Sequence, residues 1–348
     1  PMTVKWGVIG AGGIASRRTI PEGLLPSAKC ELVAVMDVDP GRASAVADRF
    51  GVPRWFTRAE DLLALPEIEA VYIATPNCYH KEQAIAAARA GKHVLVEKPM
   101  ALNERDAEEM LAACRAAGVQ LMVAYMMRFH AHHQRLKAMI EAGELGQITF
   151  GRAQLTCWYP PIPGAWRQDP DVGGGGAFID MGTHCLDLLE VLIGRVKRVC
   201  AFMRTLAFDY PVEDTATVLL EFENGAQGVV DASFCVPDEA SRNVLEIRGT
   251  RGAVTAEHTI GQEPGGTMSA IVLGQVGGYD AQQARAAAGA AQPVLVEPVN
   301  TYRAEVEYFV DCIERGREPF SGGEEALRFV RLTQAVYESA RTGRVLDV

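Results

Sequence analysis

Residues 4–15 read VKWGVIGAGGIA, and this stretch decides the fold of the first half of the chain. A short apolar run is typical of a buried β-strand, and here it leads into the pattern Gly-x-Gly-x-x-Ala before a helical stretch. In such a turn Gly10 permits a tight bend, Gly12 lets the backbone approach a pyrophosphate, and the small Ala15 allows close helix–strand packing. We therefore expect a dinucleotide-binding turn. Its assigned residues are Gly10, Gly12, Gly13 and Ile14.

An acidic residue, Asp37, ends the next apolar run at roughly the spacing expected of a ribose-binding carboxylate. A carboxylate accepts hydrogen bonds from ribose hydroxyls and repels a 2′-phosphate, so NAD is favoured over NADP as the cofactor. Arg42 lies a few residues further on and could reach a phosphate, which keeps NADP open. The competing interpretation is a tight βα turn followed by a turn-forming Asp before Pro40.

Short β-rich runs alternate with helical stretches up to residue 124, which is the pattern of βαβ units on a parallel sheet. A helix over 104–117 is bounded by Asn103, a plausible N-cap, and by Gly118. Residues 1–124 are therefore predicted to form a doubly wound, Rossmann-type α/β domain. Its expected strands are 4–9, 31–36, 70–74, 93–97 and 121–124.

The pattern changes in residues 125–348, which are predicted to form an α+β domain for substrate binding and oligomerisation. A large, mostly antiparallel open sheet is expected from the runs 148–158, 196–206, 216–222, 228–234 and 244–247, with Asn224-Gly225 as a hairpin turn. Helices are expected over 133–141, 178–192, 302–315 and 324–341, and long hairpins or an irregular excursion over 261–298. Because helices cover one face of the sheet only, we expect a homodimer or homotetramer built on the other face.

Composition excludes several classes of protein. The formal net charge is -10 without a compensating basic cluster, so a nucleic-acid partner is not expected. No apolar run approaches the roughly 20 residues of a membrane span, and no secretory leader is indicated. The eight cysteines are scattered without metal-like spacing, which favours a reducing, cytoplasmic location. His130, His132 and His133 lie together but lack further ligands, so we expect a polar helix start and no metal.

Two sequence features can carry proton-transfer chemistry. Lys98 follows Glu97 at the carboxyl end of a predicted parallel strand, the edge where such sheets bind ligands, and precedes a proline that could adopt a cis peptide. Asp180 and His184 are spaced to share one helix face, and histidine is suited to accept a hydroxyl proton near neutral pH. The alternatives are a surface lysine and an ordinary helix-face pair.

An aromatic, proline-rich segment spans residues 157–167. Tyr159 and Trp166 could stack on the apolar face of a sugar ring, and Arg167 could hold hydroxyls or a carboxylate. The same residue types also populate oligomer interfaces, so both interpretations stay open.

The sequence resembles the Gfo/Idh/MocA oxidoreductase family over nearly the whole chain. The motifs that carry the resemblance are the Gly10 turn, Ala74-Thr75-Pro76-Asn77 with His80, Ala90-Gly91-Lys92-His93-Val94 into Glu97-Lys98-Pro99, Arg128-Phe129, and Gly174-Gly175-Gly176 to Asp180 and His184. The resemblance implies a catalytic set in which His184 is the general acid/base, Asp180 tunes it and Lys98 orients the reacting oxygen. It also implies that Thr75, Asn77 and His80 lie beside the nicotinamide, Glu97 contacts the cofactor and Arg128 the substrate.

The favoured function is the reversible, NAD-dependent oxidation of a carbinol on a sugar, glycoside or cyclic polyol. One alternative is an NAD-dependent glycosidase that oxidises a ring carbon transiently and eliminates the aglycone, which net NADH production would exclude. Another is a nucleotide-sensing protein without catalysis. The joint presence of Lys98, Asp180 and His184 argues against it.

Overall fold

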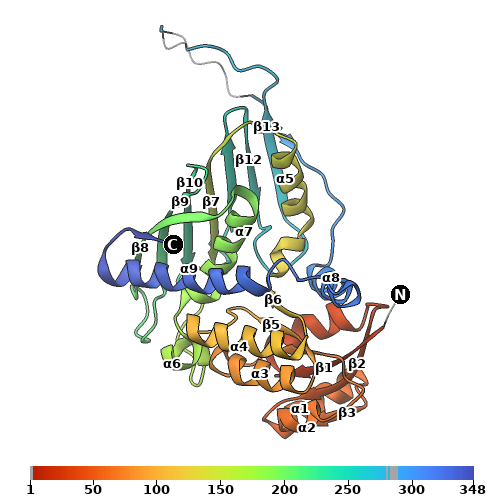
Figure 1. Cartoon of the computed structure of the whole chain (residues 1–348). Helices are drawn as coiled ribbons and strands as arrows, with labels where there is room; N and C mark the ends of the chain where they lie inside the picture. The colour runs from red at the N-terminus through yellow and green to blue at the C-terminus, as the bar shows by residue number, and fades with distance from the viewer. Residues whose placement is uncertain (1–2, 280, 283–288) are drawn as a thin grey trace. The chain divides into compact units, whose positions relative to one another are not determined.

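The computed structural model describes residues 3–279, 281–282 and 289–348, and the chain forms two compact units (Figure 1). The first unit comprises Pro1–Met126, Ile162–Asp180 and Asn300–Gln334, and the second comprises Met127–Pro161, Met181–Val299 and Ala335–Val348. Two later segments thus join the N-terminal half. We keep the two-domain division after residue 124 as a proposal about domain organisation.

A six-stranded parallel sheet forms the centre of the first unit, with the strand order β3-β2-β1-β4-β5-β6. Its strands are β1 (Val4–Ile9), β2 (Cys30–Met36), β3 (Arg54–Phe56), β4 (Ala70–Ile73), β5 (His93–Glu97) and β6 (Leu121–Ala124). The predicted Rossmann-type sheet is confirmed. The strand order reverses between β1 and β4, and in such sheets ligands bind beyond the carboxyl ends of the strands at this point.

The helices of the first unit include a π-helix, η1, directly after the glycine-rich turn. The predicted caps of α4 are confirmed, because the Asn103 side chain accepts from the Asp106 N–H and Gly118 is left-handed at φ 67°. From the C-terminal part of the chain, α8 packs on η1, and Phe309 contacts Trp6 with ring centroids 6.0 Å apart. The elements are η1 (Ala15–Leu24), α1 (Pro40–Phe50), α2 (Ala59–Leu63), η2 (Asn77–Tyr79), α3 (His80–Arg89), α4 (Glu104–Ala117), η4 (Trp166–Gln168), α6 (Pro170–Gly173) and α8 (Thr301–Arg315).

A nine-stranded sheet forms the second unit, with the order β14-β13-β12-β11-β7-β10-β9-β8-β15. Its strands are β7 (Ile148–Thr156), β8 (Val196–Arg204), β9 (Thr215–Phe222), β10 (Gln227–Ser233), β11 (Leu245–Gly249), β12 (Gly252–Glu257), β13 (Thr267–Val272), β14 (Gln292–Pro293) and β15 (Leu346–Asp347). Its described pairs are antiparallel except β7 with β10, which confirms a large, mostly antiparallel sheet. Strand β12 was not expected from the sequence, and β13 lies in the stretch 261–298 that was expected to form long hairpins or an irregular excursion.

Helix α7 (Thr183–Ile193) packs on β7 and β10 of this sheet, and α5 (Ala131–Glu141) packs on α7. The predicted helix over 178–192 divides into a π-helical turn, η5 (Phe178–Gly182), and α7. Short turns η3 (Met126–Phe129) and η6 (Asp238–Ala240) connect the other elements, and α9 (Gly323–Thr342) contributes to both units. Within the described residues, no helix has the length and apolar character of a membrane span.

Candidate functional site

The glycine-rich turn after β1 has the tight backbone that its sequence predicts. Gly10 has a φ of 88°, and a Cβ there would lie 2.8 Å from the carbonyl carbon of Ala74. The N–H groups of Gly10 and Ala11 both donate to the Met36 carbonyl, at 2.9 and 2.8 Å. A side chain at Gly10 would thus collide with the backbone of Ala74, directly after β4. The turn leaves backbone free at the helix start, where a pyrophosphate binds in Rossmann folds.

Asp37 lies buried just beyond the end of β2, with its carboxylate turned toward the glycine-rich turn. It accepts hydrogen bonds from Gly12 N at 3.1 Å and from Asp39 N at 3.0 Å. The half-exposed guanidinium of Arg42 pairs with Asp37 Oδ1 at 3.2 Å. The carboxylate predicted to bind ribose and a cation therefore lie side by side next to the glycine-rich turn. The residues present fit a nicotinamide dinucleotide. Asp37 suits a ribose with a free 2′-hydroxyl, and Arg42 suits one with a 2′-phosphate.

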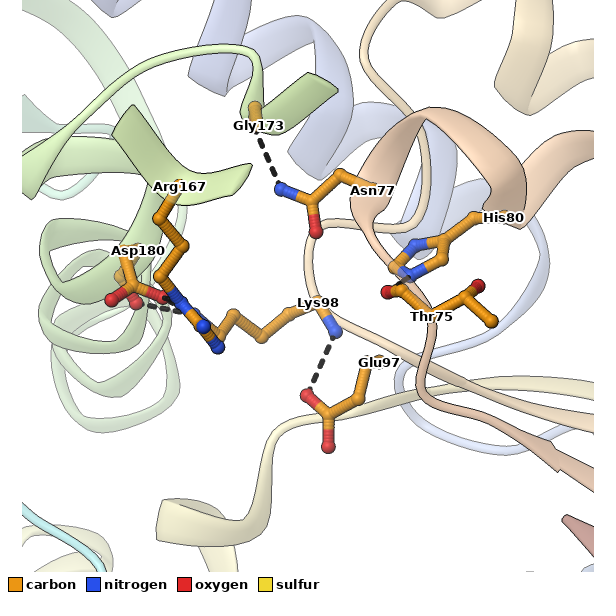
Figure 2. Close-up of polar contacts among 8 residues, drawn as sticks. All are labelled: Thr75, Asn77, His80, Glu97, Lys98, Arg167, Gly173 and Asp180. Atoms are coloured by element: carbon orange, nitrogen blue, oxygen red, sulfur yellow. Dashed lines mark hydrogen bonds and ion pairs between the residues drawn. The ribbon is translucent and has the colours of Figure 1, made fainter. Parts of the chain in front are cut away.

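Lys98, which directly follows β5, forms an ion cluster with Asp180 and Arg167 (Figure 2). Lys98 Nζ lies 3.0 Å from Asp180 Oδ1 and also donates to the Asp180 carbonyl, while Arg167 Nε lies 3.1 Å from the same Oδ1. Burial alone would raise the pKa of the Asp180 carboxyl, but the charges of Lys98 and Arg167 outweigh burial and hold that pKa well below its usual range. Asp180 is therefore an anion that holds the Lys98 ammonium, whose side chain is only 10% exposed.

The loop after β4 is tied to the lysine turn by a buried histidine. Both ring nitrogens of His80 face carbonyls, Nδ1 that of Pro99 at 2.8 Å and Nε2 that of Thr75 at 3.0 Å. The Lys98-Pro99 peptide is cis, as the sequence allowed. Asn77 Nδ2 donates to the Gly173 carbonyl at 2.8 Å (Figure 2). The structure thus brings together Thr75, Asn77, His80, Glu97, Lys98, Arg167 and Asp180, and their roles stay predictions.

Glu97 has a partner that sequence reasoning missed. The hydroxyl of Tyr72, inside β4, donates to Glu97 Oε1 at 2.5 Å, and the Lys98 N–H donates to Oε2 at 3.3 Å. Burial raises the pKa of Glu97, against the hydrogen bond from Tyr72 and the charge of Lys98, which lower it. Within the apolar run of β4, a tyrosine hydroxyl was the only available signal, and it does not reveal its partner.

Three predicted site residues belong to the second unit: Arg128, Tyr159 and His184. His184 is buried in α7. Arg128 forms a two-armed ion pair with the buried Asp187, its Nε lying 2.9 Å from Oδ2. The Tyr159 ring packs on Phe234 at 4.9 Å between centroids. The catalytic role of His184 and the substrate roles of Arg128 and Tyr159 stay predictions, as does that of Trp166, whose ring the Arg167 guanidinium covers at 4.3 Å.

The histidine cluster at the start of α5 is structural. His130 is the N-cap of α5 and accepts from His132 N at 3.3 Å through Nδ1. His133 bridges the Met127 carbonyl at 2.8 Å and the Thr259 hydroxyl at 3.1 Å. Across the described part of the chain, no group of three or more His, Cys, Asp or Glu side chains is arranged to hold a metal ion.

The Rossmann-type sheet and the Lys98–Asp180–Arg167 cluster are typical of a dinucleotide-binding oxidoreductase. Comparison with known proteins identifies the family. Residues 4–125 match the oxidoreductase family with an NAD-binding Rossmann fold, and residues 133–255 match the GFO/IDH/MocA C-terminal domain. D-xylose 1-dehydrogenase (NADP(+)) 2 of Haloferax volcanii is 31% identical over 99% of this chain and 100% of that protein. The chain belongs to the Gfo/Idh/MocA oxidoreductase family.

Other relatives agree in sequence and in structure. The 1,5-anhydro-D-fructose reductase of Ensifer adhaerens is 30% identical, covering 99% of this chain and 98% of the reductase. The crystal structure of an aldose-aldose oxidoreductase from Caulobacter crescentus, complexed with glycerol, has a TM-score of 0.88 and 28% identity, covering 99% of this chain and 100% of that one.

Proposed function

We propose that the protein transfers a hydride between a nicotinamide dinucleotide and a carbinol or carbonyl carbon of a sugar, glycoside or cyclic polyol. The observation that carries the proposal is the Lys98–Asp180–Arg167 cluster beyond β5, at the ligand-binding edge of a Rossmann-type sheet. The names of the relatives support the substrate class, since they include a xylose dehydrogenase and an anhydrofructose reductase.

The dinucleotide would be held by the glycine-rich turn, with its adenosine ribose on Asp37. When bound, its nicotinamide supplies the hydride acceptor for oxidation. We propose NAD as the preferred form, because two backbone N–H groups hold the buried Asp37 carboxylate, which would accept hydrogen bonds from ribose hydroxyls. The adjacent Arg42 supports use of NADP as well, and the Haloferax relative is named for NADP.

This chain's residues would then handle the proton and the developing charge. His184 accepts the hydroxyl proton during oxidation and returns it during reduction. Lys98 holds the substrate oxygen and stabilises the negative charge that develops when the proton leaves. Asp180, kept ionised by its two cations, fixes the ammonium of Lys98. Trp166, Tyr159, Arg128 and Arg167 would hold the sugar ring.

A panel of sugars, glycosides and inositols tests the proposal through the absorbance of the reduced cofactor. We expect turnover with at least one ring polyol. His184→Ala should lower kcat by about 10²- to 10⁴-fold and leave dinucleotide affinity nearly unchanged, because the imidazole acts in proton transfer. Lys98→Met should lower kcat and raise the substrate KM. Near-wild-type turnover and an unchanged pH profile in His184→Ala would remove His184 from the mechanism.

The NAD-dependent glycosidase is the second candidate, since the same cluster would serve transient oxidation of a ring carbon. Such an enzyme recycles its cofactor, so it would release aglycone from a glycoside without net NADH. A non-catalytic sensor would bind the dinucleotide and turn over no member of the panel.

We propose a cytoplasmic homodimer or homotetramer. All eight cysteines are free thiols, which supports a reducing compartment. Along β8 and β9, side chains alternate between buried and exposed, and the exposed set includes Phe202 and Leu219. A sheet face carrying such apolar groups suits burial against a second copy of the chain.

A further inference from the structure

A chain of hydrogen bonds runs through the interior of the first unit and ends at the backbone of Lys98. Thr19, in η1, donates from Oγ1 to the Tyr72 hydroxyl at 3.0 Å. The Tyr72 hydroxyl donates to Glu97 Oε1 at 2.5 Å, and Lys98 N donates to Glu97 Oε2 at 3.3 Å. Thr19 and Tyr72 are both buried, and Figure 2 shows the Glu97 end of the chain beside Lys98.

The direction of these hydrogen bonds follows from the donors available. The Tyr72 hydroxyl has a single proton, and because Thr19 donates to it, that proton goes to Glu97. Each oxygen of the Glu97 carboxyl then receives one donor. An ionised carboxylate is an acceptor at both oxygens and fits this arrangement, whereas a protonated carboxyl would turn an O–H toward one of the donors. The two donors directed at its two oxygens thus fit the ionised form of Glu97.

We propose that Tyr72 is a positioning residue: it holds Glu97 ionised and oriented, so that Glu97 anchors the backbone of Lys98 and aims its ammonium at Asp180. The inference rests on the catalytic role proposed for Lys98. Because Thr19 lies in the helix that follows the glycine-rich turn, the same chain links the dinucleotide-binding segment to the lysine.

Several charged and titratable groups face Glu97 from the elements around it. Lys98 and Arg167 favour its charged form, as does the hydrogen bond from Tyr72, while burial opposes that form and raises the pKa. From α8, the charge of Glu97 raises the pKa of Tyr302, and the buried Glu305 raises the pKa of both Tyr72 and Tyr302. The Tyr302 hydroxyl is buried and has no hydrogen-bond partner among the described residues. Tyr302 therefore provides a matched control, because it is a buried tyrosine near Glu97 that takes no part in the hydrogen bonds from Thr19 to Lys98.

The test compares Tyr72→Phe with Tyr302→Phe, each of which removes one buried hydroxyl. Tyr72→Phe should lower kcat about tenfold and leave dinucleotide affinity unchanged, since loss of one hydrogen bond to a charged group has about this effect. As the pH is lowered, its kcat/KM should begin to fall at a higher pH than that of the wild type, because the pKa of Glu97 rises further. Tyr302→Phe should keep the wild-type pH profile. In a Glu97→Gln background, Tyr72→Phe should add little.

A second readout needs no turnover. Infrared difference spectra recorded against pH follow the protonated carboxyl band of Glu97, which Glu97→Gln identifies by removing it. The midpoint of this band should move to higher pH in Tyr72→Phe and stay in place in Tyr302→Phe. Should Tyr72→Phe fail to fold, Thr19→Val should move the midpoint in the same direction by a smaller amount, since it removes the donor to Tyr72.

The outcomes separate this inference from the proposed function. A Glu97 band that titrates alike in the wild type, Tyr72→Phe and Thr19→Val overturns the positioning role, whatever the activity. An active, Lys98-dependent wild type with an unchanged Tyr72→Phe profile also overturns it and leaves the proposed function intact. Absence of turnover on every ring polyol, with a shifted Glu97 band, contradicts the proposed function alone.

Discussion

Acid should destabilise the second unit through the histidine cluster at the start of α5. His130 and His133 are buried, with ring centroids 4.7 Å apart. Burial and the neighbouring histidine lower the pKa of His130 to about 4 and that of His133 to about 3, from an ordinary 6.5. Protonation would put a proton on Nδ1 of His130, which accepts from the His132 N–H, and so remove the N-cap of α5.

The magnitude follows from proton linkage. Because the folded pKa values are lowered, the stabilisation is fully present above the unfolded pKa of 6.5 and is lost as the pH falls toward about 4 and about 3. Near pH 5 each histidine in the unfolded chain binds almost one proton that the folded form does not bind. The difference is about 2 kcal/mol per histidine and about 4 kcal/mol for both, relative to neutral pH.

Urea unfolding near pH 7.5 and near pH 5 measures this loss, and amide exchange over α5 locates it. His133→Gln should remove about half of the pH dependence, since glutamine keeps polar contacts and does not titrate. His258→Asn is the control, because His258 is exposed and left-handed at φ 56°, a conformation that asparagine tolerates. A wild type that loses less than about 1 kcal/mol, or a His133→Gln variant with the full pH dependence, would refute the reasoning.

Two further predictions concern the cofactor and assembly. Asp37→Ser should shift the ratio of kcat/KM for NAD over NADP by at least about tenfold, roughly 1.4 kcal/mol, because it removes a hydroxyl acceptor and a repulsive charge; a wild type that prefers NADP would contradict this role of Asp37. Light scattering should report a dimer or tetramer that Phe202→Glu dissociates, whereas a monomeric wild type at micromolar concentration would count against assembly on the β8–β9 face.

Apart from β3, the strands of the first unit were predictable because each is an apolar run bounded by turn residues. The expected ranges 4–9, 93–97 and 121–124 coincide with β1, β5 and β6. Strand β3 escaped notice because three residues are too few to show a pattern. A helical stretch was expected after the glycine-rich turn, but its π-helical form was not, although Pro21 in its interior would break an α-helix.

Long-range packing set the limit of the sequence argument. Local patterns cannot show that residues 162–180 and 300–334 join the first unit, because their partners lie far away in the chain. The sequence predicted Lys98 and Asp180 as functional groups, yet the shared carboxylate oxygen and the Tyr72 hydroxyl behind Glu97 appear only in three dimensions. The polar helix start expected at the three histidines is confirmed, since His130 is the N-cap of α5.

Arg167 changes the electrostatic balance around Asp180. Lys98 and Arg167 give two cations to the one Asp180 carboxylate, and the ionised Glu97 beside Lys98 is the second anion of the group. In the proposed reaction, a carbinol that loses its proton leaves an anionic oxygen, and the nearby ammonium of Lys98 would stabilise it. An ammonium has three donors, and in the described contacts Lys98 directs its Nζ at two oxygens of Asp180. The third donor of Lys98 is the one that we propose for a substrate oxygen.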